Sequence, residues 1–186
     1  MPRPIVRPDK NIRGLLSWEL AGFVFLTAGG SIFHFVYQWF GPSQILAAFF
    51  PVNESVWEHL KLSYWSLVLF SVFESLFMRW RTSNFWWAKG LGLVTMHGAI
   101  LAIFYTYTSI LGYHIVALDI ISYIIGAFIC QSTSFFILAR SHPSRPLNRF
   151  GAWILILHGL VLVLFTFATP RLPIFMDGRT GTYGIP

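Results

Sequence analysis

Five long apolar stretches, separated by short polar segments, dominate the pattern along the chain. Each is long enough to cross a hydrocarbon core of about 30 Å, which takes roughly 20 helical residues. Backbone polar groups cannot stay unpaired in lipid, so such spans form helices, and the alternation typical of membrane strands is absent. The pattern predicts an all-α, single-domain polytopic membrane protein over 1–186, a five-helix bundle with helices near 15–39, 54–78, 86–108, 112–139 and 150–169.

Composition supports a lipid environment, because 55% of the residues are apolar, 18% are aromatic and only 11% are charged. The first apolar stretch is too long for a secretory signal, and no A-x-A cleavage site follows it. Membrane lipids are therefore the predicted surroundings of all five helices, including the first.

Basic residues lie mainly before the first helix and in two of the connecting segments. The positive-inside rule then predicts a cytoplasmic N-terminus and an extracytoplasmic C-terminus. The net charge of +6 follows from this topology, so nucleic acid is not a predicted partner. The cations on the predicted inner side are Arg3, Arg7, Lys10, Arg13, Arg79, Arg81, Lys89, Arg140, Arg145 and Arg149, against Arg171 and Arg179 outside.

Two segments on the predicted outer side have their own character. Residues 40–53 are uncharged and carry an apolar run between two prolines, which predicts an interfacial or re-entrant loop. Asn53 is the predicted N-cap of the next helix, with Glu54 in its first turn. The tail, 170–186, is rich in turn residues and is either a loose end or a folded cap. We expect a lid, with Phe175 packed on the bundle and Asp177 or Tyr183 bonded to the outer polar residues.

Ionisable residues in membrane helices are costly and are usually functional. Glu54, Glu58 and Lys61 are spaced i, i+4 and i+7, which predicts one helix face turned into the bundle or a vestibule, and His59 points to a different neighbour. A purely structural ion-paired cluster is the alternative. Nearer the cytoplasmic side, ion pairs with arginines or snorkelling account for Glu19 and Glu74.

An offset of 61 residues superimposes a weak internal repeat without a gap. It matches Glu58 with Asp119 and His97 with His158, and relates the second and third helices to the fourth and fifth in the same orientation. The repeat predicts a carboxylate pair and a histidine pair facing each other across a pseudo-two-fold axis.

These residue types suit metal binding or acid–base chemistry. The candidate catalytic residues are Glu58, His59, Asp119 and Lys61, the last holding an anionic group. Neither H-E-x-x-H nor C-x-x-C occurs, so a divalent metal rests on proximity alone. Haem ligation by the mid-membrane His97 and His158 is less favoured than a hydrogen bond to a neighbouring helix. The candidate metal ligands are His34, Glu54, Glu58, His59 and His114.

The run N-E-S-V-W-E-H-L-K at 53–61, His34 before it and the tail L-P-I-F-M-D-G-R-T-G-T-Y-G-I at 172–185 resemble a family of small bacterial integral membrane proteins of unknown function. The resemblance covers most of the chain. It implies a polytopic helical protein of the bacterial plasma membrane, and it supplies no activity or catalytic residue.

The preferred hypothesis is an intramembrane enzyme, a hydrolase or transferase, acting on a lipid or other amphiphile at a polar site open to the outer leaflet. The alternatives are a proton- or cation-coupled transporter and a structural subunit of a membrane complex; oligomerisation stays open. An enzyme would keep its polar residues in one layer, whereas a transporter needs them to continue to the other face. In the sequence they thin out below His97 and His158, which favours the enzyme.

Overall fold

The computed structural model describes residues 12–78, 84–140, 142 and 144–186. Over these residues the fold is all-helical, with five helices long and apolar enough to cross a membrane, so the predicted fold class is confirmed. Arg79 and Arg81 lie outside the described residues. The elements are α1 (Ile12–Phe40), α2 (Gln44–Phe49), α3 (Val56–Met78), α4 (Phe85–Leu111), α5 (Val116–Arg140), α6 (Arg145–Phe167) and the 3-10 turn η1 (Pro173–Phe175).

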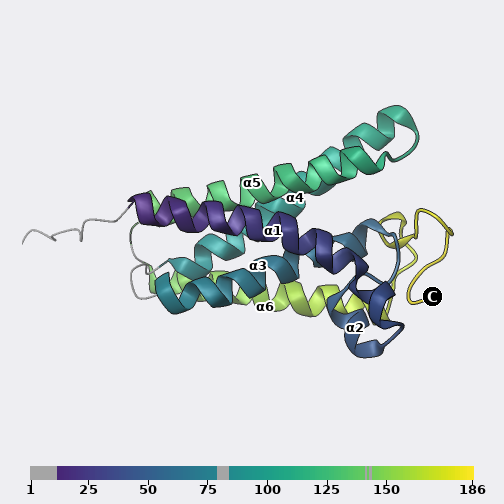
Figure 1. Cartoon of the computed structure of the whole chain (residues 1–186), viewed down its shortest axis with the longest axis horizontal. Helices are drawn as coiled ribbons and strands as arrows, with labels where there is room; N and C mark the ends of the chain where they lie inside the picture. The colour runs from purple at the N-terminus through teal and green to yellow at the C-terminus, as the bar shows by residue number, and fades with distance from the viewer. Residues whose placement is uncertain (1–11, 79–83, 141, 143) are drawn as a thin grey trace, which may run out of the picture.

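The long helices run side by side, and their connections gather at two opposite ends (Figure 1). We call the end that holds residues 41–55, 112–115 and 168–186 the tail end, and the opposite end, where α1 begins, the base. Helix α3 contacts α1, α4 and α6, and it is the most deeply buried of the candidate spans. Helices α4 and α5 form an antiparallel hairpin, with α1 against α5 and α6 against α4.

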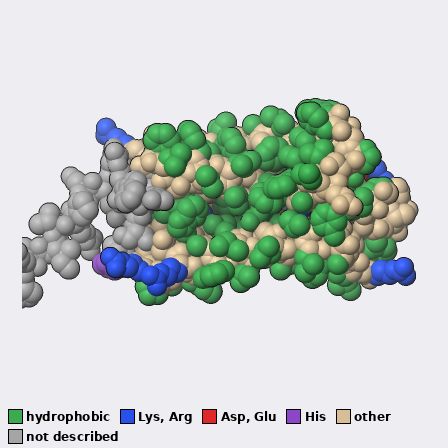
Figure 2. Space-filling view, turned by 90° about the horizontal axis from the view of Figure 1, so that it is seen from below, with side chains coloured by type: hydrophobic (Ala, Val, Ile, Leu, Met, Phe, Trp, Pro, Cys, Tyr) green, Lys and Arg blue, Asp and Glu red, His purple; other side chains and the backbone are tan. Residues whose placement is uncertain are grey.

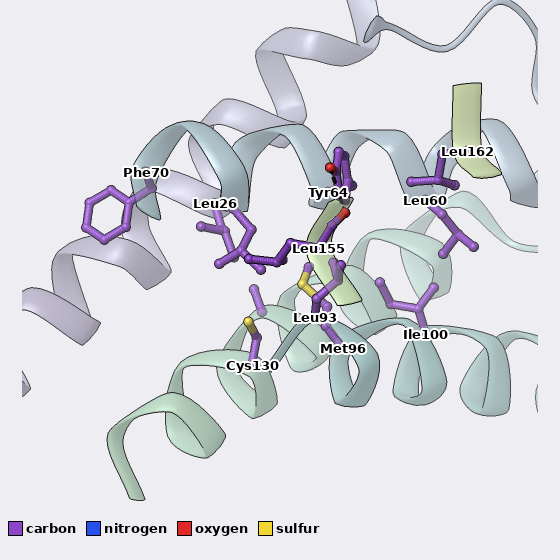
Figure 3. Close-up of a cluster of buried hydrophobic side chains, with 12 residues drawn as sticks. Leu26, Leu60, Tyr64, Phe70, Leu93, Met96, Ile100, Cys130, Leu155 and Leu162 are labelled. Carbon is purple, nitrogen blue, oxygen red and sulfur yellow. Dashed lines mark hydrogen bonds between the residues drawn. The ribbon is translucent and has the colours of Figure 1, made fainter. Parts of the chain in front are cut away.

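A hydrophobic core fills the space between the long helices (Figure 3). It includes Leu26 of α1, Leu67 of α3, Met96 of α4 and Leu162 of α6, all fully buried. The hydroxyl of Tyr64 reaches across this core from α3 and donates to the carbonyl of Leu155 on α6 at 3.0 Å. Outside the core, hydrophobic side chains cover the face seen in Figure 2, and Lys and Arg lie at its ends. That surface is suited to lipid.

The start of α3 differs from the prediction, because Ser55 rather than Asn53 occupies the cap position before the first helical residue. The Ser55 hydroxyl accepts from the backbone N–H of Glu58 at 3.3 Å, as in the S-x-x-E capping pattern. Asn53 accepts instead from the Ser55 N–H at 2.9 Å. Glu54 therefore precedes the helix, and the predicted face shared by Glu54, Glu58 and Lys61 does not form.

A short helix lies within the segment predicted to be a loop. Helix α2 occupies most of the apolar run between Pro42 and Pro51, and Ala47 in it is fully buried. The fully buried Lys61 donates to the carbonyl of Ala47 at 2.7 Å, which fixes α2 against the bundle. The prediction missed α2 because six residues are too few to show a helical period.

Helices α4 and α6 approach each other closely at two glycines, Gly90 and Gly151. A Cβ added to Gly90 would lie 2.6 Å from the Gly151 carbonyl oxygen, and one added to Gly151 would lie 2.3 Å from Trp87 Cα. Both obstacles are backbone atoms, which cannot rotate away. Close backbone contact of this kind helps to hold membrane helices together. Large apolar side chains contribute less, since they contact lipid tails as favourably as they contact another helix.

We predict that Gly151→Ala destabilises the bundle by about 1–3 kcal/mol, the usual cost of overpacking. The matched control is Gly98→Ala, where an added Cβ meets no atom within 4 Å. The free energy of unfolding in mixed micelles is the measurement. Equal stability of the two variants would contradict the close α4–α6 contact.

Candidate functional site

A cluster of potential metal ligands lies at the tail end, where α1 ends and α3 begins. His34, Glu54 and His59 each offer one ligand atom, and these atoms all lie within 4.8 Å of one another. Nε2 of His59 is 3.4 Å from Oε2 of Glu54, and Nε2 of His34 is 3.9 Å from Oε1. The side chains are partly exposed, so solvent or a ligand can reach them.

The backbone sets the tautomer of His59. Its Nδ1 lies 2.8 Å from the carbonyl oxygen of Ser55, which can only accept, so Nδ1 carries the proton. In the neutral ring Nε2 then presents a lone pair toward the Glu54 carboxylate. The lone pairs of His59 Nε2 and Glu54 Oε2, 3.4 Å apart, repel each other unless a proton or a metal ion lies between them. Metal-bound histidines are commonly oriented by this kind of hydrogen bond.

A cavity of about 230 Å³ adjoins the cluster. His34 and Glu54 form part of its wall, and Asp177 and Arg179 of the tail form another part. Nη1 of Arg179 lies 3.9 Å from Glu54 Oε1, while most of the arginine side chain is exposed. The cavity therefore joins candidate metal ligands to a cation that can bind an anionic group.

The tail is folded onto the bundle, as expected for a cap. Phe175 is buried, with its ring 4.7 Å from that of Trp57 and 5.6 Å from that of Phe165. Asn53 donates to the carbonyl of Gly184 at 2.8 Å. These contacts bear out the expected packing of Phe175, whereas the use of the tail as a lid stays a prediction.

Asp177 links the tail to the candidate metal ligands. Its carboxylate accepts from the backbone N–H groups of Glu54 at 3.1 Å, Arg179 at 2.7 Å and Thr180 at 2.9 Å. Burial alone would raise the pKa of Asp177, but these N–H donors outweigh it and hold the pKa below the usual value. The ionised form of Asp177 thus orders the tail around Glu54.

Directly beneath the cluster, Glu58 and Lys61 form a buried ion pair at 2.5 Å. Lys61 also donates to Ala47 and, at 3.0 Å, to the Thr166 hydroxyl, so its three N–H groups have three acceptors. Glu58 accepts from Thr166 at 2.8 Å and from the Val52 N–H at 3.1 Å. With every partner supplied by the protein, this pair is suited to anchoring α2 and α6 rather than to holding a substrate.

The two histidines predicted to lie in the middle of the membrane, His97 and His158, contact each other. Nδ1 of His97 lies 2.9 Å from Nε2 of His158, and Nε2 of His97 lies 2.7 Å from the Ser63 hydroxyl. Ser63 donates to the Leu60 carbonyl, so His97 donates to Ser63 and accepts from His158. Two rings in direct hydrogen-bond contact leave no space for a porphyrin between them.

Asp119 and His114 belong to a separate network on the α4–α5 hairpin. Asp119 accepts from the Tyr107 hydroxyl and faces Nδ1 of His114 at 3.2 Å. The partners of Asp119 are thus different from those of Glu58, its equivalent in the 61-residue repeat. Of the two pairs expected to face each other, only His97 and His158 are in contact.

A second buried polar cluster, the base cluster, lies toward the base. Lys89 of α4 is 3.1 Å from both carboxylate oxygens of Glu19 on α1 and 2.8 Å from Oε2 of Glu74 on α3. Ser134 of α5 donates to Glu19 at 2.7 Å. The sequence interpretation explained the two glutamates by ion pairs or snorkelling on the arginine-rich side, and the structure bears out ion pairs, with Lys89 as the partner in place of an arginine. Lys89 was expected among the cations of a connecting segment, but it is fully buried between the carboxylates.

The model of a family of unknown function, DUF6512, matches residues 9–185. The chain belongs to this family. No curated protein and no solved structure matches it. The DUF6512 match includes both the α3 start and the tail, so the tail-end cluster lies entirely within the family region.

We predict that Asp177→Asn releases the tail. The amide group carries no charge, so hydrogen exchange at the backbone N–H groups of Glu54, Arg179 and Thr180 should quicken by at least roughly tenfold. Arg171→Gln, at an exposed tail position, is the control.

Acidification should release the tail in the same way. The pKa of Asp177 is depressed in the folded state, so its stabilising effect is complete above about 3.9, the usual Asp value, and is lost as pH falls through the folded-state pKa. Exchange that is equally slow in Asp177→Asn would contradict this account of the tail.

Proposed function

We propose that the protein is a membrane-embedded, metal-dependent enzyme whose active site opens at the tail end of the bundle. The observation that carries this proposal is the convergence of His34, Glu54 and His59 within 4.8 Å. Two histidines and one glutamate are a donor set of catalytic zinc sites, in which the fourth position holds water.

The geometry fits a small divalent ion. A tetrahedral zinc ion with bonds of about 2.0 Å separates its ligand atoms by roughly 3.3 Å. The three candidate ligand atoms lie within 4.8 Å of one another, so side-chain movement would bring them to binding distance. A bound ion would also neutralise the repulsion between His59 Nε2 and Glu54. When bound, such an ion supplies a water molecule acidic enough to act as a nucleophile at neutral pH.

The surroundings suggest the substrate class. Arg179 lines the adjoining cavity, and apolar helix surface borders the tail end. An amphiphile can keep its apolar part in lipid while its anionic head group binds Arg179. Arg179 therefore takes the role that the sequence interpretation gave to Lys61, and hydrolysis of an anionic lipid or similar amphiphile is the proposed reaction. Under the predicted orientation this chemistry takes place on the extracytoplasmic side.

We predict that the purified protein binds one zinc ion and that His34→Ala or His59→Ala weakens binding by more than about tenfold. His114→Ala is the matched control, since His114 lies at the same end but pairs with Asp119. Equilibrium dialysis with elemental analysis measures the affinity.

The catalytic claim has its own test. Zinc-loaded protein in vesicles of mixed anionic and zwitterionic phospholipid should release hydrolysis products from the anionic component, and His34→Ala should not. Tight zinc binding that is unaffected by either tail-end histidine would contradict the site, and zinc binding without turnover would contradict the reaction.

A second candidate is proton-coupled transport, favoured by one observation. Buried polar side chains continue along α3 from Glu58 through Ser63 to Glu74, so they do not thin out below the histidine pair as the sequence suggested. A transporter needs polar groups that continue toward the other face, so this arrangement favours a transporter.

For this candidate we predict a proton flux in vesicles that contain the protein and a trapped pH-sensitive dye. Flux should fall at least roughly tenfold in His97→Ala, which breaks the hydrogen-bonded contacts with Ser63 and His158. His114→Ala should retain it. Flux no greater than in protein-free vesicles would contradict transport.

A further inference from the structure

The base cluster contains more negative than positive charge. Its ionisable members are Glu19, Glu74 and Lys89, which are 3%, 0% and 0% exposed. Among the described residues no other basic side chain lies within 4 Å of either carboxylate. If all three groups were ionised, one negative charge would remain uncompensated in the interior of a membrane protein.

The described residues of the surrounding helices do not supply the missing charge. On α5, Ser134 bonds to Glu19 as a neutral donor, and Cys130 is a buried thiol. An uncompensated buried charge is among the most unfavourable arrangements in a protein, and a carboxylate can avoid it by taking up a proton.

We propose that the base cluster is a proton-binding site that holds one exchangeable proton on Glu74 at neutral pH. Glu19 has two short contacts with Lys89 and one with Ser134, which favour its ionised form. Glu74 has only Lys89, on Oε2, and its Oε1 has no hydrogen-bond partner among the described residues. The less solvated carboxylate takes the proton.

Two further buried polar groups adjoin the site. Ser71, one turn before Glu74 on α3, has a hydroxyl without a hydrogen-bond partner in the described part of the chain. The same holds for the amide of Gln131, one turn before Ser134 on α5. A Cβ on Gly22 would lie 2.3 Å from this amide nitrogen, so the glycine leaves it room beside α1. These groups can solvate a proton or the water that delivers it.

Binding changes the charge of the base cluster from −1 to 0, with the proton taken from water and returned to it. The site lies at the opposite end of α3 from the tail-end cluster and does not depend on metal binding. Uptake and release of this proton would give the bundle two electrostatic states.

Infrared spectroscopy of the protein in lipid tests the site directly. At neutral pH the wild type should show a carboxylic-acid C=O band that shifts in D₂O and, after carboxyl-¹³C labelling of glutamate, shifts again. Only Glu19, Glu54, Glu58 and Glu74 can contribute to the part of the band that shifts with the glutamate label, because the chain has no other glutamate.

Variants of the base cluster should abolish the band or strengthen it, depending on which charge is removed. Glu74→Gln should abolish it, and so should Glu19→Gln, because one carboxylate then balances one ammonium. Lys89→Met should roughly double it, since both carboxyls become protonated. Glu54→Gln, which alters only the tail-end cluster, should leave it unchanged.

Absence of the band from the wild type, or its persistence in Glu74→Gln, would overturn the proposal. The wild-type and isotope measurements decide the first point even if a variant does not fold. Loss of zinc binding in His34→Ala with the band intact would separate this site from the proposed enzyme site.

Discussion

The polar side of α3 must be kept away from lipid, and the rest of the structure depends on that constraint. Along this helix Glu58, Lys61, Ser63, Ser66 and Glu74 are all buried. None could face hydrocarbon without a large free-energy cost, so α1, α4 and α6 pack against α3. The partners of its polar side chains come from α2, α4 and α6. The opposite side of α3 exposes apolar residues near the base, where it is suited to lipid.

The same constraint distinguishes buried polar residues whose hydrogen bonds are all made within the protein from partly exposed ones that a ligand can reach. Lys61 has an acceptor for each N–H, and such saturation suits a structural anchor. His34, Glu54 and His59 instead lie where the chain leaves the bundle, and they are partly exposed, with contacts of 3.4 Å and 3.9 Å among them. Groups with spare coordination at the edge of a rigid bundle can bind an ion without disrupting packing.

The five helices could be predicted from the sequence because the hydropathy averaged over a continuous stretch of about 20 residues identifies a membrane helix. It named His34, Glu54 and His59 as candidate metal ligands from residue type and predicted side, and these three lie together. It also named Glu58 and His114, which pair instead with Lys61 and Asp119. It could not place Lys89 against Glu19, since that contact joins residues 70 apart and no local pattern encodes it. The predicted N-cap of α3 was wrong for a different reason. Asn53 and Ser55 are both favourable N-cap residues, and only Glu58, three residues after Ser55, distinguishes them.

Anomalous diffraction at the zinc edge from zinc-soaked crystals tests the central claim of a metal site at the tail end most directly. The account predicts one strong peak within about 2.2 Å of a ring nitrogen of His34, a carboxylate oxygen of Glu54 and Nε2 of His59. A peak at His114 and Asp119 instead, or no ordered peak at the tail end, would contradict it.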